Sequence, residues 1–184
     1  MIYLTSDLHL NHNRGFIYEP RGFHSVEEMN EAIIDLWNKT VTDDDDVYLL
    51  GDVMLGDTQL GIELFKKLKG KIHIVLGNHD TDTRVELYRT LPNVVEVALA
   101  LKIKYNGYHI LMTHYPCFSG SLHHESLKKT TCNFYGHTHQ NTNFYQDIPF
   151  MYHVGVDSHN CTPINIDDIL KEMEEKVKEC IEYL

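Results

Sequence analysis

Residues 71–80 read Lys-Ile-His-Ile-Val-Leu-Gly-Asn-His-Asp, an apolar run that ends in a cluster of polar side chains. Four other short apolar runs end in a similar way, each in a histidine or an acidic residue. Their endings are Asp7-Leu-His9, Gly51-Asp52, Thr113-His114 and Gly136-His137-Thr-His139. Short apolar runs bounded by glycine and polar residues are typical of buried strands. We therefore predict five strands, each with a polar cluster at its carboxyl end.

The segments between these strands carry helical signals in the first half of the chain. Ser25-Val-Glu-Glu28 is a capping box, and apolar residues at helical spacing follow it. Further helices are expected over Thr58–Lys69, over Asp82–Thr90 and from Asp167 onward. In the second half, Asn106-Gly107 separates two alternating runs and predicts a two-residue hairpin.

The chain has 184 residues, a length that suits one domain, and we expect residues 1–184 to form it. Strands alternate with helices in the first half, and hairpins are expected to dominate the second. This pattern predicts an α/β sandwich built on mixed sheets.

Composition and charge exclude several classes of protein. The chain has 16 basic and 27 acidic residues and a net charge of −11, which argues against a non-specific nucleic-acid binder. The N-terminus lacks the pattern of a signal peptide, and no apolar run approaches the ~18 residues that span a membrane. The four cysteines match no zinc-binding spacing and are interpreted as free thiols. We therefore expect a soluble, cytoplasmic protein with no membrane partner.

The five polar clusters are expected to converge, because ligands in α/β folds bind at the carboxyl ends of the strands. The clusters offer carboxylates, one amide oxygen and several imidazoles, but no thiolate. These donors suit Mn²⁺, Fe, Zn²⁺ or Ni²⁺ better than Ca²⁺ or an iron–sulfur cluster. The candidate ligands are too many for one tetrahedral zinc and fit two metal ions that share a carboxylate. The clusters that supply them are Asp7-Leu-His9, Asp52, Asn78-His79-Asp80, His114 and His137-Thr-His139.

Other polar residues have simpler interpretations. A single polar residue after a strand is ordinary turn chemistry, so only the five clusters together predict a site. The run Asp43–Asp46 lacks EF-hand spacing and is interpreted as a solvated turn. His153 and His159 are interpreted as structural or surface residues. From the residues alone, His79 is either a catalytic group or one more ligand.

The chain closely resembles the calcineurin-like metallophosphoesterases in five ordered blocks: Asp7-x-His9, Gly51-Asp52, Gly77-Asn78-His79-Asp80, His114 and Gly136-His137-x-His139. The resemblance implies a four-layer α/β/β/α sandwich around a dinuclear metal site. It also implies ligand roles. Asp7, His9 and His139 would hold one metal, Asn78, His114 and His137 would hold the other, and Asp52 would bridge both. Manganese is the metal that we expect first.

The same resemblance assigns His79 as a catalytic histidine that binds no metal, and Asp80 as the acidic residue that orients it. Two cations about 3.5–4 Å apart can share a hydroxide, which would attack phosphorus in line. His79 could protonate the leaving alkoxide, an effect of roughly 10²–10⁴-fold. A neighbouring carboxylate such as Asp80 would keep that imidazole charged more of the time.

The loop after the first cluster contains the residues that we expect to touch substrate, namely His12, Arg14 and Arg21. Arginine is well shaped for bidentate contact with phosphate. His123 and His124 are further candidates for contact with substrate. The alternative is that they belong to a solvated loop.

The residues that follow Gly51-Asp52 indicate which class of substrate to expect. Large protein phosphatases of the superfamily carry an arginine shortly after the Gly-Asp block, whereas Gly51-Asp52 here continues as Val-Met-Leu-Gly-Asp57. This difference argues against a phosphoprotein phosphatase. Arg21-Gly-Phe-His-Ser-Val-Glu-Glu-Met-Asn and Val154-Gly-Val-Asp157 look like the small bacterial or phage-type phosphoesterases.

We therefore expect a metal-dependent phosphoesterase that acts on a phosphodiester or nucleotide-type small molecule, with nucleic acid only as a substrate. A phosphomonoesterase is the nearest alternative. A catalytically silent scaffold should have lost ligands or His79, and this chain keeps all of them. A metal sensor or storage protein would not need the His79-Asp80 pair. The oligomeric state is left open.

Overall fold

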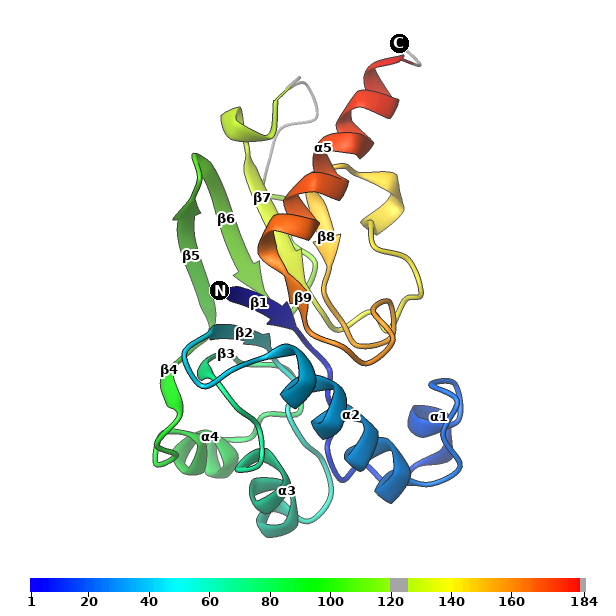
Figure 1. The fold of residues 1–184 in the computed structure, drawn as a ribbon, viewed down its shortest axis with the longest axis vertical. Coiled ribbons are helices and arrows are strands. Elements are labelled where there is room, and N and C mark those ends of the chain that lie inside the picture. Colours follow the sequence, from blue (N-terminus) through cyan, green and yellow to red (C-terminus); the bar gives the residue numbers. More distant parts are fainter. Residues whose placement is uncertain (120–125, 183–184) are drawn as a thin grey trace.

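The computed structural model describes residues 1–119 and 126–182 (Figure 1). The strands described there form two sheets. The first sheet contains β1 (Ile2–Thr5), β2 (Asp46–Leu50), β3 (Lys71–Val75), β4 (Val94–Ala98) and β9 (Ile164–Asn165). The second contains β5 (Ala100–Tyr105), β6 (Tyr108–Thr113), β7 (Thr131–Tyr135) and β8 (Met151–His153). The helices are α1 (Gly15–Tyr18), α2 (Val26–Thr40), α3 (Thr58–Phe65), α4 (Asp82–Tyr88) and α5 (Ile166–Glu182), with short 3₁₀ turns at Leu127–Lys129 and Tyr145–Asp147.

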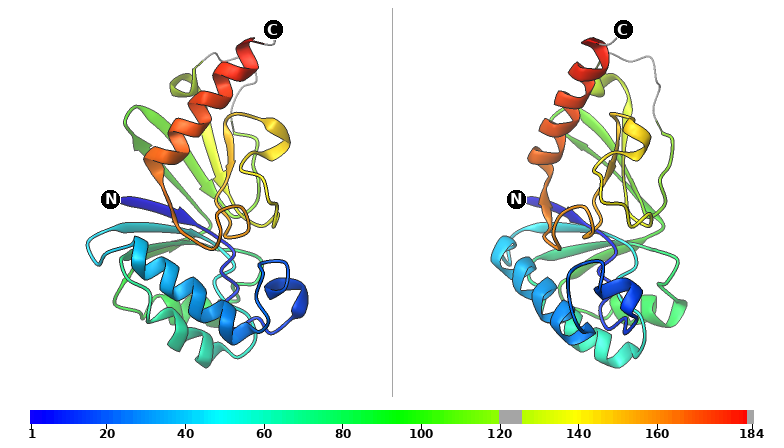
Figure 2. Two further views of the ribbon diagram at one scale, coloured as in Figure 1. Left: turned by 45° about the vertical axis from the view of Figure 1, so that its right-hand side comes forward. Right: turned by 90° about the vertical axis from the view of Figure 1, so that its right-hand side faces the viewer.

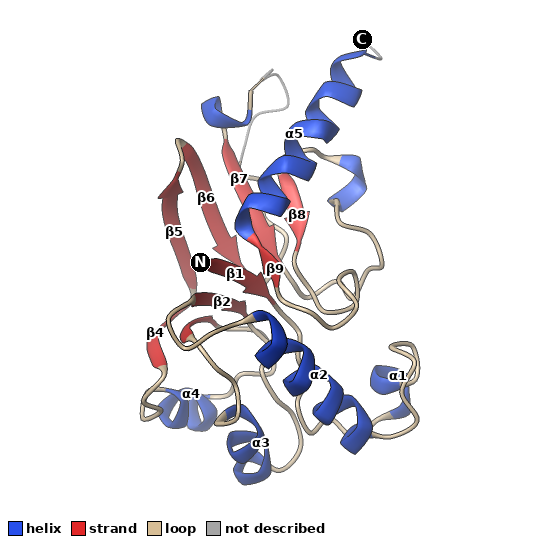
Figure 3. Ribbon diagram, viewed as in Figure 1, coloured by secondary structure: helices blue, strands red, loops and turns tan. Residues whose placement is uncertain are grey.

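The first sheet is mostly parallel, in the order β4-β3-β2-β1-β9, with β9 antiparallel at one edge. Helices α2, α3 and α4 lie together on one side of this sheet (Figure 3). Trp37, Phe65 and Tyr88, one from each helix, are fully buried in one cluster with Leu49 and Ile74. Burial of these side chains holds the carboxyl ends of β1, β2 and β3 at one edge.

The second sheet has the order β5-β6-β7-β8. Asn106 and Gly107 have φ values of 46° and 88°, so the predicted two-residue hairpin between β5 and β6 is confirmed. Instead of the expected further hairpins, β7 pairs in parallel with β6, and β8 in parallel with β7. The ends of β6 and β7 therefore lie side by side, next to the first sheet.

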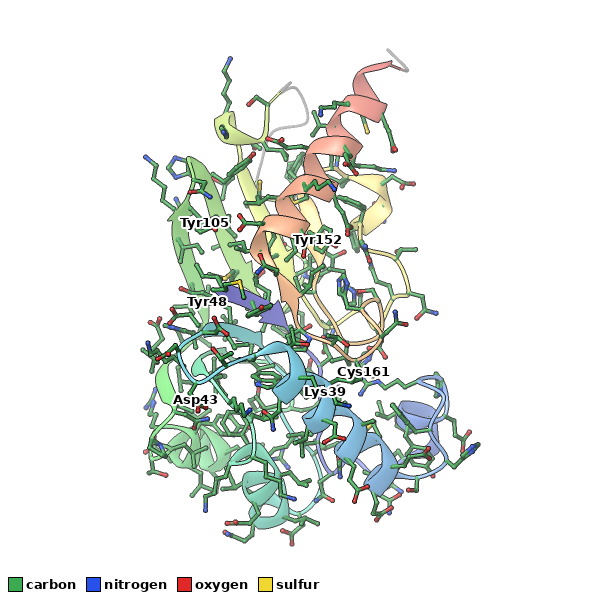
Figure 4. The ribbon with its side chains drawn as sticks, in the orientation of Figure 1. Lys39, Asp43, Tyr48, Tyr105, Tyr152 and Cys161 are labelled. Atoms are coloured by element: carbon green, nitrogen blue, oxygen red, sulfur yellow. The ribbon has the colours of Figure 1, made fainter. Side chains whose placement is uncertain are left out.

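The two sheets and α5 share a second hydrophobic core (Figure 2). Leu4 of the first sheet, Phe134 of the second and Met173 of α5 are all buried in it. Tyr105 donates to Asp167 Oδ1 (3.0 Å) and Tyr152 to Glu172 Oε2 (2.8 Å), so polar contacts also join α5 to the second sheet (Figure 4). The predicted α/β fold with mixed sheets is confirmed.

Three local features differ from the sequence prediction. Asp45 is 4% exposed and accepts hydrogen bonds from the Thr42 amide and hydroxyl and from the Met1 amino group, so it does not belong to the solvated turn. Helix α3 ends at Phe65 rather than at Lys69. Strand β4 was not predicted; its residues Val94-Val-Glu-Val-Ala98 are mostly apolar but show no alternation of buried and exposed side chains at the edge of the sheet.

In the described part of the chain, none of the helices is long and apolar enough to span a membrane.

Candidate metal centre and active site

The five predicted clusters follow β1, β2, β3, β6 and β7 and meet where the two sheets approach each other. Hydrogen bonds tie the loops together. The Asp7 amide donates to the Gly51 carbonyl (3.0 Å), and the Gly136 amide donates to the His114 carbonyl (2.9 Å). The His137 amide donates to Asp7 Oδ2 (2.9 Å), which links the second sheet to the first.

Five of the seven predicted ligands have a left-handed backbone. The φ values are 57° at Asp7, 48° at His9, 52° at Asp52, 69° at His137 and 46° at His139. This conformation is rare for residues other than glycine and costs about 1–3 kcal/mol each, so it persists where the surrounding fold imposes it. Strain of this kind concentrates at functional sites.

The glycines of the motifs permit the close approach of these loops. A Cβ on Gly51 would lie 2.6 Å from Gly77 N and 2.6 Å from His114 Nδ1. A Cβ on Gly77 would lie 2.2 Å from Asp52 Oδ1. Any side chain at either position would push the loops apart.

Asp7, His9 and His139 form a first ligand group, with one candidate atom from each inside a 4.8 Å span. His9 Nε2 lies 3.2 Å from His139 Nε2, which lies 3.9 Å from Asp7 Oδ1. Behind the group, His9 Nδ1 is 3.2 Å from His12 Nδ1, and His139 Nδ1 donates to Asp157 Oδ2 (2.8 Å). These outer contacts direct both Nε2 atoms toward the same point.

Asn78, His114 and His137 form a second ligand group. Asn78 Oδ1 lies 2.9 Å from His114 Nε2 and 2.9 Å from His137 Nδ1, and these two nitrogens are 3.2 Å apart. His114 Nδ1 donates to the Leu50 carbonyl (2.8 Å), which leaves a lone pair on Nε2 toward the group.

Asp52 lies between the two groups. Its Oδ2 is 3.6 Å from His9 Nε2 and 3.6 Å from His114 Nε2. Its Oδ1 accepts a hydrogen bond from the His79 amide (2.9 Å), which fixes the carboxylate. Asp7, Asp52 and His114 also offer ligand atoms within a 4.8 Å span, so the two carboxylates connect the groups.

The donor set fits divalent cations. Carboxylate oxygens, an amide oxygen and imidazole nitrogens with free lone pairs crowd together, although acceptor atoms repel one another unless a proton or a cation lies between them. The absence of sulfur donors from these two groups matches the metals that prefer mixed nitrogen and oxygen ligands.

Burial sets the protonation of the ligands. Burial lowers the pKa of His9 to about 2, helped by the charge of Arg21, and burial also lowers the pKa of His137. Burial opposes protonation of His139 too, but its hydrogen bond to Asp157 and the charge of Asp7 raise its pKa overall. Burial raises the pKa of Asp7, although nearby histidines act against it. Neutral imidazoles at His9 and His137 are the form that binds metal.

His79 lies at the open side of the two groups. Its side chain is 39% exposed, and its Nε2 is 3.9 Å from Asp52 Oδ2. Its ring lies edge-on to that of His9, at 5.5 Å between centroids. His79 is therefore within reach of a group bound at the ligands and also of solvent.

Asp80 does not have the place that the sequence predicted. Its Oδ2 accepts from the Gly77 amide (2.8 Å) and the Asp52 amide (2.9 Å), and its Oδ1 accepts from the Tyr88 hydroxyl (2.9 Å). The carboxylate thus ties the loops after β2 and β3 together instead of orienting the His79 imidazole. Burial raises the pKa of Asp80, and these hydrogen bonds oppose the shift.

Arg84 supports His79, a role that sequence reasoning missed. This buried arginine on α4 donates to the His79 carbonyl (2.6 Å) and to the Gly56 carbonyl (3.2 Å). It stands apart from the motifs, so no local signal marks it.

The three residues predicted to touch substrate have three different positions. Arg21 is 2% exposed at its side chain and donates to Asp157 Oδ1 (2.8 Å) and to the Asp7 carbonyl (2.9 Å), so it positions the first group instead. His12 is buried against His9. Arg14, at the exposed start of α1, keeps its predicted role as a candidate.

Asp157 is a second functional residue that sequence reasoning missed. In the sequence, the segment Val154-Gly-Val-Asp157 indicates only a resemblance to small bacterial or phage-type phosphoesterases. No neighbouring residue indicates that Asp157 contacts His139. His123 and His124 lie outside the described residues.

A cavity of about 710 Å³ opens beside the first group. Its lining includes His9, His79 and His139 and apolar side chains of residues 16–23. This volume is in the range of sites for small organic ligands.

Comparisons with known proteins find relatives along the whole chain. Residues 1–176 match the family model of the calcineurin-like phosphoesterase superfamily domain. The uncharacterized protein MJ1445 of Methanocaldococcus jannaschii is 35% identical over 184 residues, which cover 94% of this chain and 91% of the relative. The gene 66 protein of Mycobacterium phage D29 is 24% identical over 200 residues, which cover 97% and 98% of the two chains.

A solved structure shares the fold. The protein of unknown function AQ665 from Aquifex aeolicus superposes with a TM-score of 0.70 at 23% identity, and the match covers 93% of this chain and 98% of that one.

Proposed function

This chain belongs to the calcineurin-like phosphoesterase superfamily, and we propose that it is a dinuclear metal-dependent phosphodiesterase for a small-molecule or nucleotide-type ester. The family assignment supports hydrolysis of phosphate esters. The two-metal site, the preference for a diester, and manganese as the metal are the parts of the proposal that need experiment.

The observation that carries the proposal is the position of Asp52 between two ligand groups. One group is Asp7, His9 and His139, and the other is Asn78, His114 and His137. The same Asp52 oxygen is 3.6 Å from a histidine nitrogen of each group, which supports a bridging role. A protein that held a single structural metal would have no use for the second group.

The residues of the chain supply the remaining parts of the reaction. Bound divalent cations would activate water and neutralise charge on the phosphate oxygens. The ligand loops fix the geometry in advance, since a backbone amide donates to Asp7 and His139 donates to Asp157, which holds these two ligands in place. His79 would give a proton to the leaving oxygen, from a position next to Asp52 and open to solvent.

The preference for a diester is supported by the shortage of free positive charge. Arg21 is the one arginine among the described residues that line the cavity, and its guanidinium is already held by Asp157 and by the Asp7 and Leu8 carbonyls. A monoester dianion would gain from an additional cation, whereas a diester carries a single charge. A phosphomonoesterase is the second candidate, because exposed Arg14 could supply that cation.

The test is hydrolysis of bis-p-nitrophenyl phosphate and p-nitrophenyl phosphate after chelation and reloading with Mn²⁺. We expect faster turnover of the diester and no turnover without metal. Faster turnover of the monoester would make the protein a phosphatase. No turnover of either ester with Mn²⁺, Ni²⁺, Zn²⁺ or Fe²⁺ would contradict the proposal and favour a silent scaffold.

A further inference from the structure

The cavity beside the first ligand group has walls of two kinds. His9, His79 and His139 are among its lining residues, so a phosphate ester bound at the candidate ligands would have this cavity beside it. The position of His79 at this border is where a leaving oxygen would need a proton.

Apolar side chains of residues 16–23 also line the cavity, together with Arg21 of the same segment. Phe16 is 71% exposed, and its ring lies edge-on to His12 with centroids 5.7 Å apart and an interplanar angle of 87°. Ile17 and Phe23, from the same segment, also line the cavity, with Leu55 facing it from the loop after β2. An exposed phenylalanine at the mouth of a polar site offers a free ring face for stacking.

Charge inside the cavity is already paired. The Arg21 guanidinium is bonded to both Asp157 oxygens (2.8 and 3.2 Å), and Asp157 also accepts from His139. A second phosphate or carboxylate would therefore find no counterion among the described lining residues. Exposed Asn141 and Asn160 bring amide groups to the rim, and amides both donate and accept hydrogen bonds.

We propose that this cavity binds the base of a nucleoside phosphate ester, with Phe16 as the stacking surface. The proposal rests on the proposed function, because it places the phosphate at the ligand groups. A neutral planar ring with polar edges satisfies each wall: it stacks on Phe16, excludes water from the apolar segment and meets amides at its rim. Stacking accepts every base, so the site selects nucleosides as a class.

The first experiment compares two inhibitors of bis-p-nitrophenyl phosphate hydrolysis by the Mn²⁺-loaded enzyme. Adenosine 5′-monophosphate and ribose 5-phosphate share the phosphate and the sugar and differ in the base. We expect the former to bind at least about 10-fold more tightly, since stacking on one aromatic ring has that order of effect. The Phe16→Ala variant should lose most of this ratio, and Phe16→Trp should keep it.

Phe118→Ala is the matched control, because Phe118 is 54% exposed, packs on Phe150 and does not line the cavity. It should leave the inhibition ratio unchanged. Equal inhibition by the two compounds in the parent enzyme, or an equal ratio in Phe16→Ala, would overturn the proposal while leaving the phosphodiesterase intact.

The second experiment is independent of catalysis. Adenosine and ribose are titrated into the metal-free protein, and amide shifts of residues 15–23 are followed by NMR. We expect adenosine to shift these amides and ribose to leave them in place. Absence of shifts with adenosine would overturn the proposal even if esters are hydrolysed. Shifts in a protein that hydrolyses no ester would reject the proposed function and retain a nucleoside site.

Discussion

The two ligand groups are supported in different ways. In the group of Asp7, His9 and His139, charged side chains provide the outer support: Asp157 accepts from His139, and Arg21 clamps Asp157. In the group of Asn78, His114 and His137, a main-chain carbonyl holds His114. A side-chain support can be removed by one substitution, whereas a main-chain support cannot. The first group can therefore be weakened by itself, whereas the carboxylates of Asp52 and Asp7 connect the two groups.

The largest effect is expected from Asp52→Asn, because this substitution removes the charge that both groups share. We expect metal content, measured by inductively coupled plasma mass spectrometry, to fall at both sites. Diesterase activity should fall by more than the roughly 10²–10⁴-fold that a general acid contributes. Asp43→Asn, in the exposed turn, removes the same charge and should change neither quantity. Normal turnover with full metal content in Asp52→Asn would rule out the proposal that Asp52 joins two metal ions.

The next effect concerns His79, which we assign to neither group. In His79→Ala, metal content should stay at the parental level while kcat falls by roughly 10²–10⁴-fold. The loss should be larger for a methyl ester than for a p-nitrophenyl ester, because a poor leaving group depends more on the proton. Loss of metal would instead make His79 a ligand.

A smaller effect is expected from Asp157→Asn, which weakens the support of the first group alone. Calorimetric titration with Mn²⁺ should show one of two sites weakened by about 10–100-fold, the usual effect of losing an outer hydrogen-bond partner of a ligand. The matched control is Asp147→Asn, whose exposed carboxylate pairs with Lys176 and belongs to neither ligand group. If both sites weakened equally, the two groups would not have separate supports.

The smallest effect is a pH dependence that arises beneath the Asp157 loop. His153 is fully buried and donates to Ser158 Oγ (2.8 Å), and burial lowers its pKa to about 3. Between its ordinary pKa near 6.5 and this value, the unfolded chain binds more protons than the folded one, so stability falls as pH falls. From pH 7.5 to pH 5 this histidine should cost about 2 kcal/mol.

Urea unfolding of the metal-free protein at pH 7.5 and pH 5 measures this effect. His153→Gln should lose about 2 kcal/mol less than the parent between the two values, whatever its stability at pH 7.5. Parallel losses in both proteins would show that His153 is not the group responsible.

The sequence predicts the candidate metal ligands better than it predicts the side chains that hold those ligands in place. Strand ends and motif glycines are local signals, and they were enough to bring together residues such as Asp7, Asp52 and His114. The supports are long-range. Arg21 meets Asp157 across 136 positions, so its charge looked available for substrate when it was not.

Two further predictions from the sequence were wrong because they, too, depend on contacts between distant segments. Asp80 stands beside His79 in the sequence, but its side chain turns toward backbone amides on the neighbouring loop. The parallel pairing of β7 with β6 leaves no mark in either strand's pattern, because both pairings bury the same residues. Packing between distant segments decides such features.

The separation of His9 and His139 along the chain also determines when the first ligand group is complete during synthesis. These two residues are separated by 130 positions, and a ribosome adds roughly 5–20 residues per second, so on the order of ten seconds separate their synthesis. No nascent chain that ends before residue 139 carries the first group. The complete first group therefore exists only after residue 139 has been synthesised, so no metal ion can bind all three of its ligands until about three quarters of the chain has been made.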